Sequence, residues 1–132
     1  MKTYLTIHAV AENSGGEYLL LQRAPHRSNP GSWNCITGFV QDRESAEEAA
    51  LRELKEETNL TGEIIKTTIP FWRERDDTRW VVISSLIKIK NETELKIDPG
   101  ESSDFKWVLP NDDLAKASAA FQASLKNLEI VK

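Results

Sequence analysis

Carboxylates gather in one short stretch of this chain. From Gln41 to Glu57 there are seven acidic residues and three basic ones, so this stretch carries a net charge equal to that of the whole chain, −4. The acids and bases elsewhere cancel. An acidic focus on an otherwise neutral chain indicates a bound cation more than a nucleic-acid-binding face, which would be basic. From charge alone, a solvated acidic helix remains the alternative.

Three of these acids share one side of a predicted helix. At about 100° per residue, Glu53, Glu56 and Glu57 fall within one arc of about 100°. The neighbouring stripe is apolar and consists of Ala50, Leu51 and Leu54. Crowded carboxylates repel one another, and a divalent cation reverses the sign of that interaction. Mg²⁺ in particular binds through a few carboxylates together with water and phosphate oxygens.

Both ends of this helix are marked in the sequence. Ser45, followed three residues later by Glu48, has the pattern of a capping box, in which each side chain accepts from the other residue's backbone N–H. After Thr58, Asn59 tolerates the left-handed conformation that ends many helices. The helix is therefore predicted to begin at Ser45 and to end near Thr58.

The same acids belong to a longer spaced pattern. It consists of Gly38, Glu44 and the run Arg52 to Leu60, which reads Arg-Glu-Leu-Lys-Glu-Glu-Thr-Asn-Leu. In residue types and spacing this pattern resembles the signature of the Nudix hydrolases. One position departs from it, because Asn59 stands where the signature has glycine, and asparagine also tolerates positive φ.

The resemblance implies an enzyme that uses Mg²⁺, with Mn²⁺ as a possible substitute. Its reaction would be hydrolysis of a diphosphate linkage by attack of water at phosphorus, in a nucleoside triphosphate-like or nucleoside diphosphate-linked substrate. Arg52 would orient a motif glutamate such as Glu44, and Gly38 would allow close backbone approach to metal or phosphate. The predicted catalytic residues are Glu53, Glu56, Glu57, Arg52 and Glu101, and the predicted metal-binding residues are Gly38, Glu53, Glu56, Glu57 and Glu101.

Glu101 lies outside the motif. It follows Asp98-Pro99-Gly100, a turn that could bring a carboxylate over the helix. We predict that it is the general base or an additional metal ligand. A solvated loop acid is the alternative, in which case the base lies within the motif.

Predicted substrate-binding residues are of two kinds. A guanidinium group forms bidentate contacts with phosphate, and the candidates for phosphate binding, with ordinary surface charge as the alternative, are Arg23, Arg27, Arg73, Arg75 and Arg79. The candidates for stacking on a base or pterin ring, with packing in the core as the alternative, are Trp33, Phe39, Trp72 and Trp80. His8 and His26 lack the spacing of a metal site and receive no role.

A narrower resemblance concerns three segments. Trp33 to Gly38, Thr78-Arg79-Trp80 and Glu101 to Trp107 together resemble the dihydroneopterin triphosphate pyrophosphatase branch of the family. A pterin triphosphate is therefore a candidate substrate beside nucleotides.

The elements that must position these residues alternate along the chain. A second predicted helix, which could be broken, spans about Asp112 to Leu128. Strand-like runs are Tyr4–Val10, Tyr18–Gln22, Asn34–Thr37, Ile64–Phe71, Trp80–Ile89 and Asp104–Val108. A long helix between strands predicts an α/β fold, with a central mixed sheet covered by helices on both faces. This is the Nudix-like α/β/α sandwich, here as a single domain over residues 1–132.

The composition limits the cellular compartment and the kinds of partner that we expect. There is no apolar run of the roughly 20 residues that a membrane span needs, and a lone Cys35 cannot form an internal disulfide. We therefore expect a cytoplasmic protein that acts on a small-molecule substrate, without a membrane or nucleic-acid partner. A homodimer is a candidate for its assembly. Two rival functions remain at this stage: a non-catalytic nucleotide sensor with the same fold, and an RNA cap-processing hydrolase.

Overall fold

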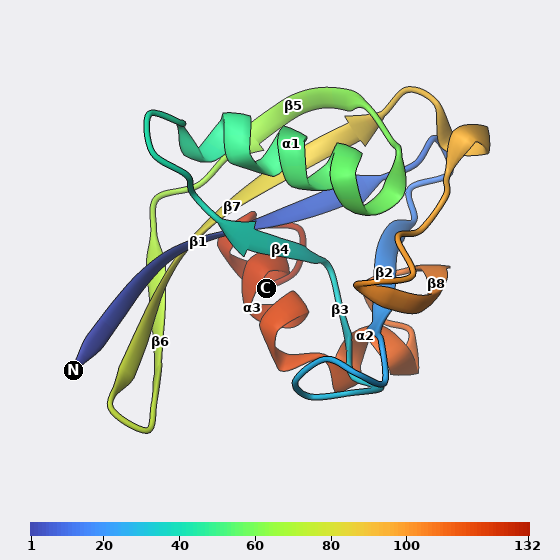
Figure 1. Cartoon of the computed structure of the whole chain (residues 1–132). Helices are drawn as coiled ribbons and strands as arrows, with labels where there is room; N and C mark the ends of the chain where they lie inside the picture. Colours follow the sequence, from blue (N-terminus) through green and yellow to red (C-terminus); the bar gives the residue numbers. More distant parts are fainter.

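The computed structural model describes residues 1–132 as a twisted sheet with helices on both of its faces (Figure 1). The strands are β1 (Lys2–Glu12), β2 (Tyr18–Arg23), β3 (Trp33–Asn34), β4 (Ile36–Phe39), β5 (Gly62–Thr67), β6 (Phe71–Arg75), β7 (Thr78–Ile89) and β8 (Ser102–Val108). The helices are α1 (Ala46–Thr58), α2 (Asp113–Ala117) and α3 (Ala119–Asn127), with a 3₁₀ turn η1 (Glu92–Glu94). None of the helices combines the length and the apolarity that crossing a membrane requires.

The sheet is mixed, as the sequence predicts. Its main path runs β3-β2-β1-β7-β5, and β4, β6 and β8 pair with β1, β7 and β2 respectively. β1 and β7 are parallel along their whole length, from Lys2 opposite Thr78 to Glu12 opposite Lys88. Every other pairing is antiparallel. β1 therefore lies at the centre of the fold.

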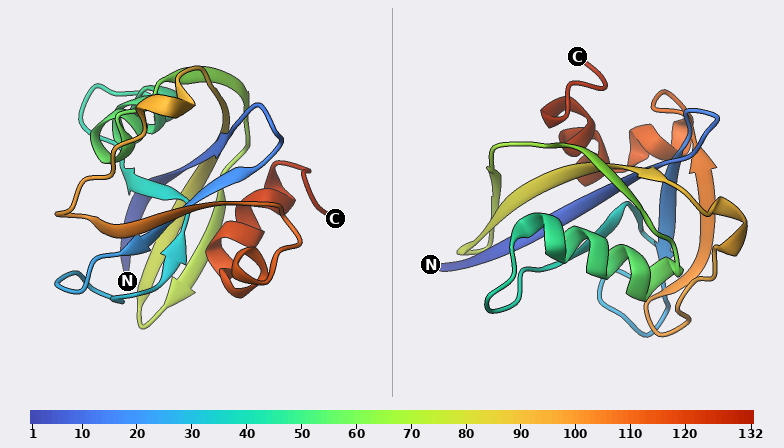
Figure 2. Two further views of the ribbon diagram at one scale, coloured as in Figure 1. Left: turned by 90° about the vertical axis from the view of Figure 1, so that its right-hand side faces the viewer. Right: turned by 90° about the horizontal axis from the view of Figure 1, so that it is seen from above.

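Helices lie on both faces of the sheet (Figure 2), and each face packs on its own apolar cluster. On one face, Ile7 and Ala9 of β1 pack in the cluster that contains Leu54 of α1. On the other face, Val10 of β1 packs in the cluster that contains Phe121 of α3. Alternate residues of one strand thus serve opposite faces, and the predicted α/β/α sandwich is confirmed.

Some predicted boundaries differ from the structure. The single strand expected over Ile64–Phe71 is two strands, β5 and β6, separated at Pro70, which has no N–H to donate to a ladder. The strand expected over Asn34–Thr37 is likewise divided at Cys35. The second helix is broken at Ser118, whose hydroxyl accepts from the backbone N–H of Phe121 and caps α3.

One predicted core residue is on the surface. Leu51 was expected in the apolar stripe of the first helix, but its side chain is 37% exposed. The buried residues of α1 are Ala49, Ala50, Leu54 and Thr58. The buried face is therefore rotated away from Leu51 and toward the arc that carries Glu57.

Candidate active site

Helix α1 presents the predicted acids from a firmly defined position. Both halves of the capping box are present, with Glu48 N donating to Ser45 Oγ at 3.1 Å and Ser45 N donating to Glu48 Oε1 at 3.0 Å. At the other end Asn59 adopts a left-handed φ of 62°, as its residue type predicts. These caps fix where the helix begins and ends, and the packing of Ala49, Ala50 and Leu54 in the core fixes which side of it faces the sheet.

Arg52 forms hydrogen bonds with several of the motif acids. Its Nε and Nη2 donate to the two oxygens of Glu44 at 2.7 and 3.0 Å. Its Nη1 donates to Glu53 at 2.9 Å and to Glu56 at 3.2 Å, while Nη2 also donates to the carbonyl of Phe39 at 3.0 Å. The hydrogen bonds from Arg52 hold the pKa of Glu44 below its ordinary value. One guanidinium group thus ties three carboxylates to the end of β4.

Glu57 is the most unusual of the acids. Its Oε2 is buried and has no hydrogen-bond partner. Burial first, and then the neighbouring carboxylates of Glu53 and Glu101, raise its pKa to about 9. A buried carboxylate oxygen without a donor is costly, and a second carboxylate beside it makes ionisation harder still. A divalent cation would relieve both penalties.

The carboxylates do not form a closed cage. No group of three or more Asp, Glu, His or Cys side chains converges on one point in the structure, and Glu53 and Glu56 are each paired with Arg52. Mg²⁺ suits such an open arrangement, since it keeps several waters and takes further oxygens from substrate phosphates. The donor set around Glu57 therefore fits a hard divalent cation.

Gly38 has a steric reason to be glycine. A Cβ at this position would overlap the Cδ, Oε1 and Cγ atoms of Glu53. Its φ is not left-handed, so the requirement comes from the close approach of β4 to α1. Gly38 lets the Glu53 carboxylate lie directly on the strand.

Glu101 is held beside the motif by a neighbouring loop. Arg27 Nη2 lies 3.6 Å from Glu101 Oε2. The ring of His26 is hydrogen-bonded through Nε2 to the carbonyl of Gly100 at 2.9 Å, and Ala24 N donates to the carbonyl of Glu101 at 3.0 Å. The turn that carries Glu101 is therefore tied to the segment after β2.

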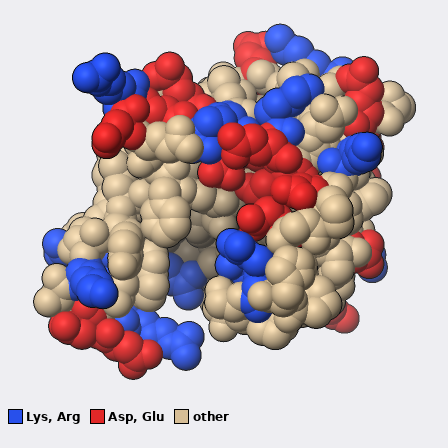
Figure 3. Space-filling view, in the orientation of Figure 1, with Lys and Arg blue, Asp and Glu red and all other residues tan.

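A cleft of about 920 Å³ brings these groups together. One wall carries Glu53, Glu56 and Glu57, and the lining also includes the basic residues Arg23, Arg27, Arg73 and Arg75. Figure 3 shows acidic side chains gathered over α1 on this face, with basic side chains close to them. An anionic substrate held by the arginines would present its phosphates to the carboxylates through a cation.

Comparison with known proteins decides the family. The NUDIX domain family model matches residues 2–127 of the chain. The chain belongs to the Nudix family. It is 32% identical over 110 residues to the nucleoside triphosphatase NudI of Escherichia coli O17:K52:H18, an alignment that covers 74% of this chain and 76% of that protein.

Solved Nudix structures share the fold. The MutT protein of Methanosarcina mazei Go1 superposes with a TM-score of 0.80 at 22% identity, covering 98% of this chain and 94% of that one. The MutT Nudix hydrolase of Burkholderia pseudomallei gives a TM-score of 0.81 at 20% identity, covering 97% and 99%. The chain is a Nudix pyrophosphohydrolase. Nudix hydrolases act on small nucleotide substrates and generally use a divalent metal, usually Mg²⁺.

The predicted substrate-binding residues of this Nudix chain do not all meet at the cleft. Arg23 and Phe39 line it. Arg79 does not: its neighbour Trp80 lines the cleft, so Arg79 points to the opposite face of the sheet, and its Nε is buried without a partner. Trp33 lines a separate cavity of about 420 Å³ with Leu114 of α2.

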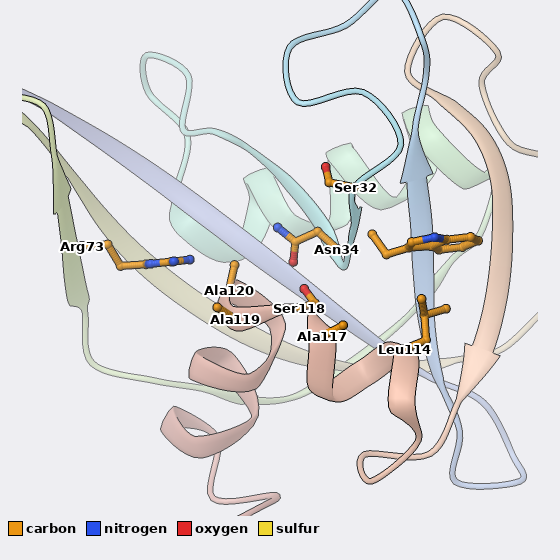
Figure 4. Close-up of a pocket in the computed structure, with 9 residues that line it drawn as sticks. Ser32, Asn34, Arg73, Leu114, Ala117, Ser118, Ala119 and Ala120 are labelled. Carbon is orange, nitrogen blue, oxygen red and sulfur yellow. The ribbon is translucent and has the colours of Figure 1, made fainter.

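That smaller cavity adjoins the Nudix cleft. Ser32, Asn34, Arg73 and Ala120 line both spaces. Figure 4 shows the Arg73 side chain extending from its strand toward Ala119 and Ala120 at the start of α3. The predicted stacking role of Trp33 therefore concerns this side chamber and not the wall that bears the carboxylates.

One cleft residue was missed by the sequence analysis. His8 lines the cleft and is hydrogen-bonded through Nδ1 to Ser124 Oγ at 2.6 Å. The two residues are 116 positions apart, so no local spacing could indicate the contact. The only signal in the sequence was a histidine in the middle of an apolar strand.

Proposed function

We propose that this Nudix chain is a Mg²⁺-dependent nucleoside triphosphate pyrophosphohydrolase. The observation that carries the proposal is the unpartnered, buried Glu57 oxygen beside Glu53, at the wall of a cleft that also carries arginines. Its 32% identity with a protein named as a nucleoside triphosphatase supports the choice of substrate class. A substrate in which a nucleoside diphosphate is linked to another group would satisfy the same chemistry.

Glu53, Glu56 and Glu57 are the residues that would hold the metal. When bound, Mg²⁺ supplies a polarised water and neutralises charge on the phosphoryl oxygens. Arg52 keeps Glu53 and Glu56 in place through its Nη1, and Glu44 in turn fixes the orientation of Arg52. Gly38 leaves room for the Glu53 carboxylate. These residues form one preorganised unit.

We assign phosphate binding to the arginines that line the cleft. Arg23 lies close enough to Glu57 to lower its pKa, against the larger effect of burial. Its Nε and Nη2 are held by Ser28, at 2.7 Å to the carbonyl and 3.1 Å to the hydroxyl. Arg23 therefore has a fixed position from which to neutralise a phosphate next to the carboxylates.

Glu101 is the proposed acceptor for the proton of the attacking water. Its side chain is 33% exposed and lies 3.6 Å from Arg27, so it is open to the cleft while its turn is fixed. A general base needs reach to the water as well as basicity. An additional metal-binding role for Glu101 would use the same position.

A substrate screen tests the proposal. Purified protein is incubated with Mg²⁺, Mn²⁺ or excess chelator, and products are identified by mass. The substrates are nucleoside and oxidised nucleoside triphosphates, dihydroneopterin triphosphate, ADP-ribose, dinucleoside polyphosphates and capped RNA. We expect a nucleoside triphosphate to give the monophosphate and pyrophosphate with metal only. Turnover in chelator after verified metal removal would contradict the metal role, and preference for capped RNA would contradict the substrate class.

Several finer expectations stay predictions. They are a pterin triphosphate substrate, a cytoplasmic location and a homodimer. The same screen tests the first, and light scattering at several protein concentrations tests the last.

A further inference from the structure

A chain of buried polar side chains crosses the core beside the cleft. Ser84 of β7 and Ser124 of α3 have no exposed surface, and His8 of β1 is 6% exposed. Ser84 Oγ donates to Ser124 Oγ at 3.0 Å, and Ser124 Oγ lies 2.6 Å from His8 Nδ1. Burying three polar groups among apolar neighbours is costly unless each is satisfied. None of them has a role in the proposed metal site.

The direction of the hydrogen bond from Ser84 indicates where the next proton lies. Ser124 Oγ accepts from Ser84, and its only other side-chain hydrogen bond is with His8. The Ser124 hydroxyl proton therefore has one acceptor, the Nδ1 of His8. A neutral imidazole that accepts at Nδ1 carries its proton at Nε2. Burial, and then the charge of Arg73, lower the pKa of His8 to about 4, so the ring is neutral at pH 7.

The other ring nitrogen faces the cleft. Nε2 makes no hydrogen bond within the protein and is not among its buried unpartnered atoms, while His8 itself is part of the cleft lining. Phe71 of β6 packs edge-on to the imidazole with ring centroids 6.4 Å apart, which limits its rotation. The ring is thus held from behind by Ser124 and from the side by Phe71.

We propose that His8 is a specificity-determining residue, whose Nε2–H donates a hydrogen bond to the ring of the substrate. This inference rests on the proposed function and specifies the substrate further. The donor requires an acceptor, and the acceptor that we specify is a carbonyl oxygen on the ring of the substrate. It disfavours an exocyclic amino group at the same place, because two donors would then face each other without water. The substrate class is a triphosphate whose ring presents a carbonyl edge.

The tautomer can be measured without any substrate. The chain has two histidines, so His26→Gln leaves one imidazole to observe by long-range ¹H–¹⁵N NMR. We expect Nδ1 to have the shift of an unprotonated nitrogen at pH 7 and Nε2 that of a protonated one. In Ser124→Ala we expect this preference to weaken. A proton on Nδ1 in the protein with Ser124 intact would overturn the inference.

Selectivity is measured with pairs of triphosphates that exchange a carbonyl for an amino group, ITP with ATP and UTP with CTP. For the pair that the enzyme hydrolyses with the higher kcat/KM, we expect kcat/KM to be higher for the triphosphate with the carbonyl group. In His8→Phe and in Ser124→Ala this ratio should fall at least about tenfold, through KM and with kcat nearly unchanged. His8→Gln, which keeps an N–H donor, should retain part of the preference.

The outcomes separate this inference from the proposed function. An unchanged ratio in His8→Phe with a native circular dichroism spectrum, or a wild-type preference for the amino member, would overturn the role of His8. A fall in kcat for both members alike would also overturn it, because it would indicate a structural role. Absence of turnover with every nucleotide would contradict the proposed function, whereas the NMR measurement would still decide the tautomer.

Discussion

At the scale of single residues, the site depends on one close steric fit and one unsatisfied oxygen. Gly38 and Glu53 lie in contact because the glycine has no side chain, and Glu57 is buried without a donor for its Oε2. In a protein without a ligand, the unpartnered oxygen of Glu57 is unfavourable and the close fit of Gly38 to Glu53 is unnecessary. Two predictions test whether they serve the metal.

The first prediction concerns the acids. Glu57→Gln and Glu56→Gln should each lower kcat by roughly 10²-fold or more, because an isosteric amide removes charge where the transition state needs the metal. In metal-free buffer Glu57→Gln should melt no lower than the parent, since the carboxyl group with its raised pKa is already largely protonated at pH 7. Activity assays and calorimetry check this. A wild-type rate in either folded variant would refute the assignment.

The second prediction concerns Gly38. Gly38→Ala should displace the Glu53 carboxylate and reduce both activity and Mg²⁺ affinity by about tenfold or more, as loss of metal-ligand positioning does. Gly15→Ala is the matched control, because a Cβ there would meet Asn13 Oδ1 and Glu17 Oε1 only at ordinary distances of 3.5 and 3.7 Å. Metal titration of both variants by calorimetry distinguishes them. Equal affinities would show that the fit is not needed.

At the scale of elements, α1 could be predicted almost completely from the sequence. Its start, its end and the side that carries the acids all follow from local rules, namely the Ser45 capping box, the left-handed Asn59 and the helical period. The exception is Leu51, because the exact rotation of a helix against a sheet depends on packing that periodicity does not contain. The contact of His8 with Ser124 was equally inaccessible, since it joins the first strand to the last helix.

The third prediction belongs to α1. Ser45→Ala removes the acceptor for Glu48 N and should destabilise the protein by about 1 kcal/mol, as loss of an N-cap does. Neither Ser45 nor Glu48 is part of the cleft lining, so kcat should remain close to that of the parent protein at temperatures where the variant is folded. Urea unfolding and assays at 20 °C measure the two effects. A large loss of kcat would mean that the cap controls the orientation of the acids more directly.

The turn that carries Glu101 gives the fourth prediction. Glu101→Gln should lower kcat by a similar factor for every accepted substrate, because the diphosphate chemistry is common to them. Arg27→Gln is its comparison, since it removes the ion pair at 3.6 Å and keeps the carboxylate. If Glu101→Gln leaves kcat unchanged on the best substrate, the base lies within the motif.

At the scale of the whole molecule, stability depends on pH through His8, which joins the first strand to the last helix. The pKa of His8 falls from 6.5 to about 4 on folding. At pH values between these two, the unfolded chain therefore binds a proton at His8 that the folded protein does not bind. Stability from His8 is therefore complete above pH 6.5 and lost as pH falls toward 4, by about 1.4 kcal/mol per unit. Glu57, whose pKa is raised, acts in the opposite direction.

The fifth prediction separates these two effects. Between pH 7 and pH 5, the free energy of unfolding of the parent should fall relative to that of His8→Gln by about 2 kcal/mol. Because Glu57 is present in both proteins, its contribution cancels in the comparison. Urea titrations at the two pH values measure the difference. Parallel pH dependences would contradict the burial of a neutral imidazole.

The parallel pairing of β1 with β7 has a consequence for synthesis on the ribosome. When the chain has emerged as far as Asp77, β1 can pair with β2 and β4, but its parallel partner, which spans Thr78–Ile89, does not yet exist. Apolar residues of the central strand then face solvent or a chaperone, and the face that α3 covers stays open for longer still. The nascent protein must therefore postpone closure of its core until translation has passed most of its length.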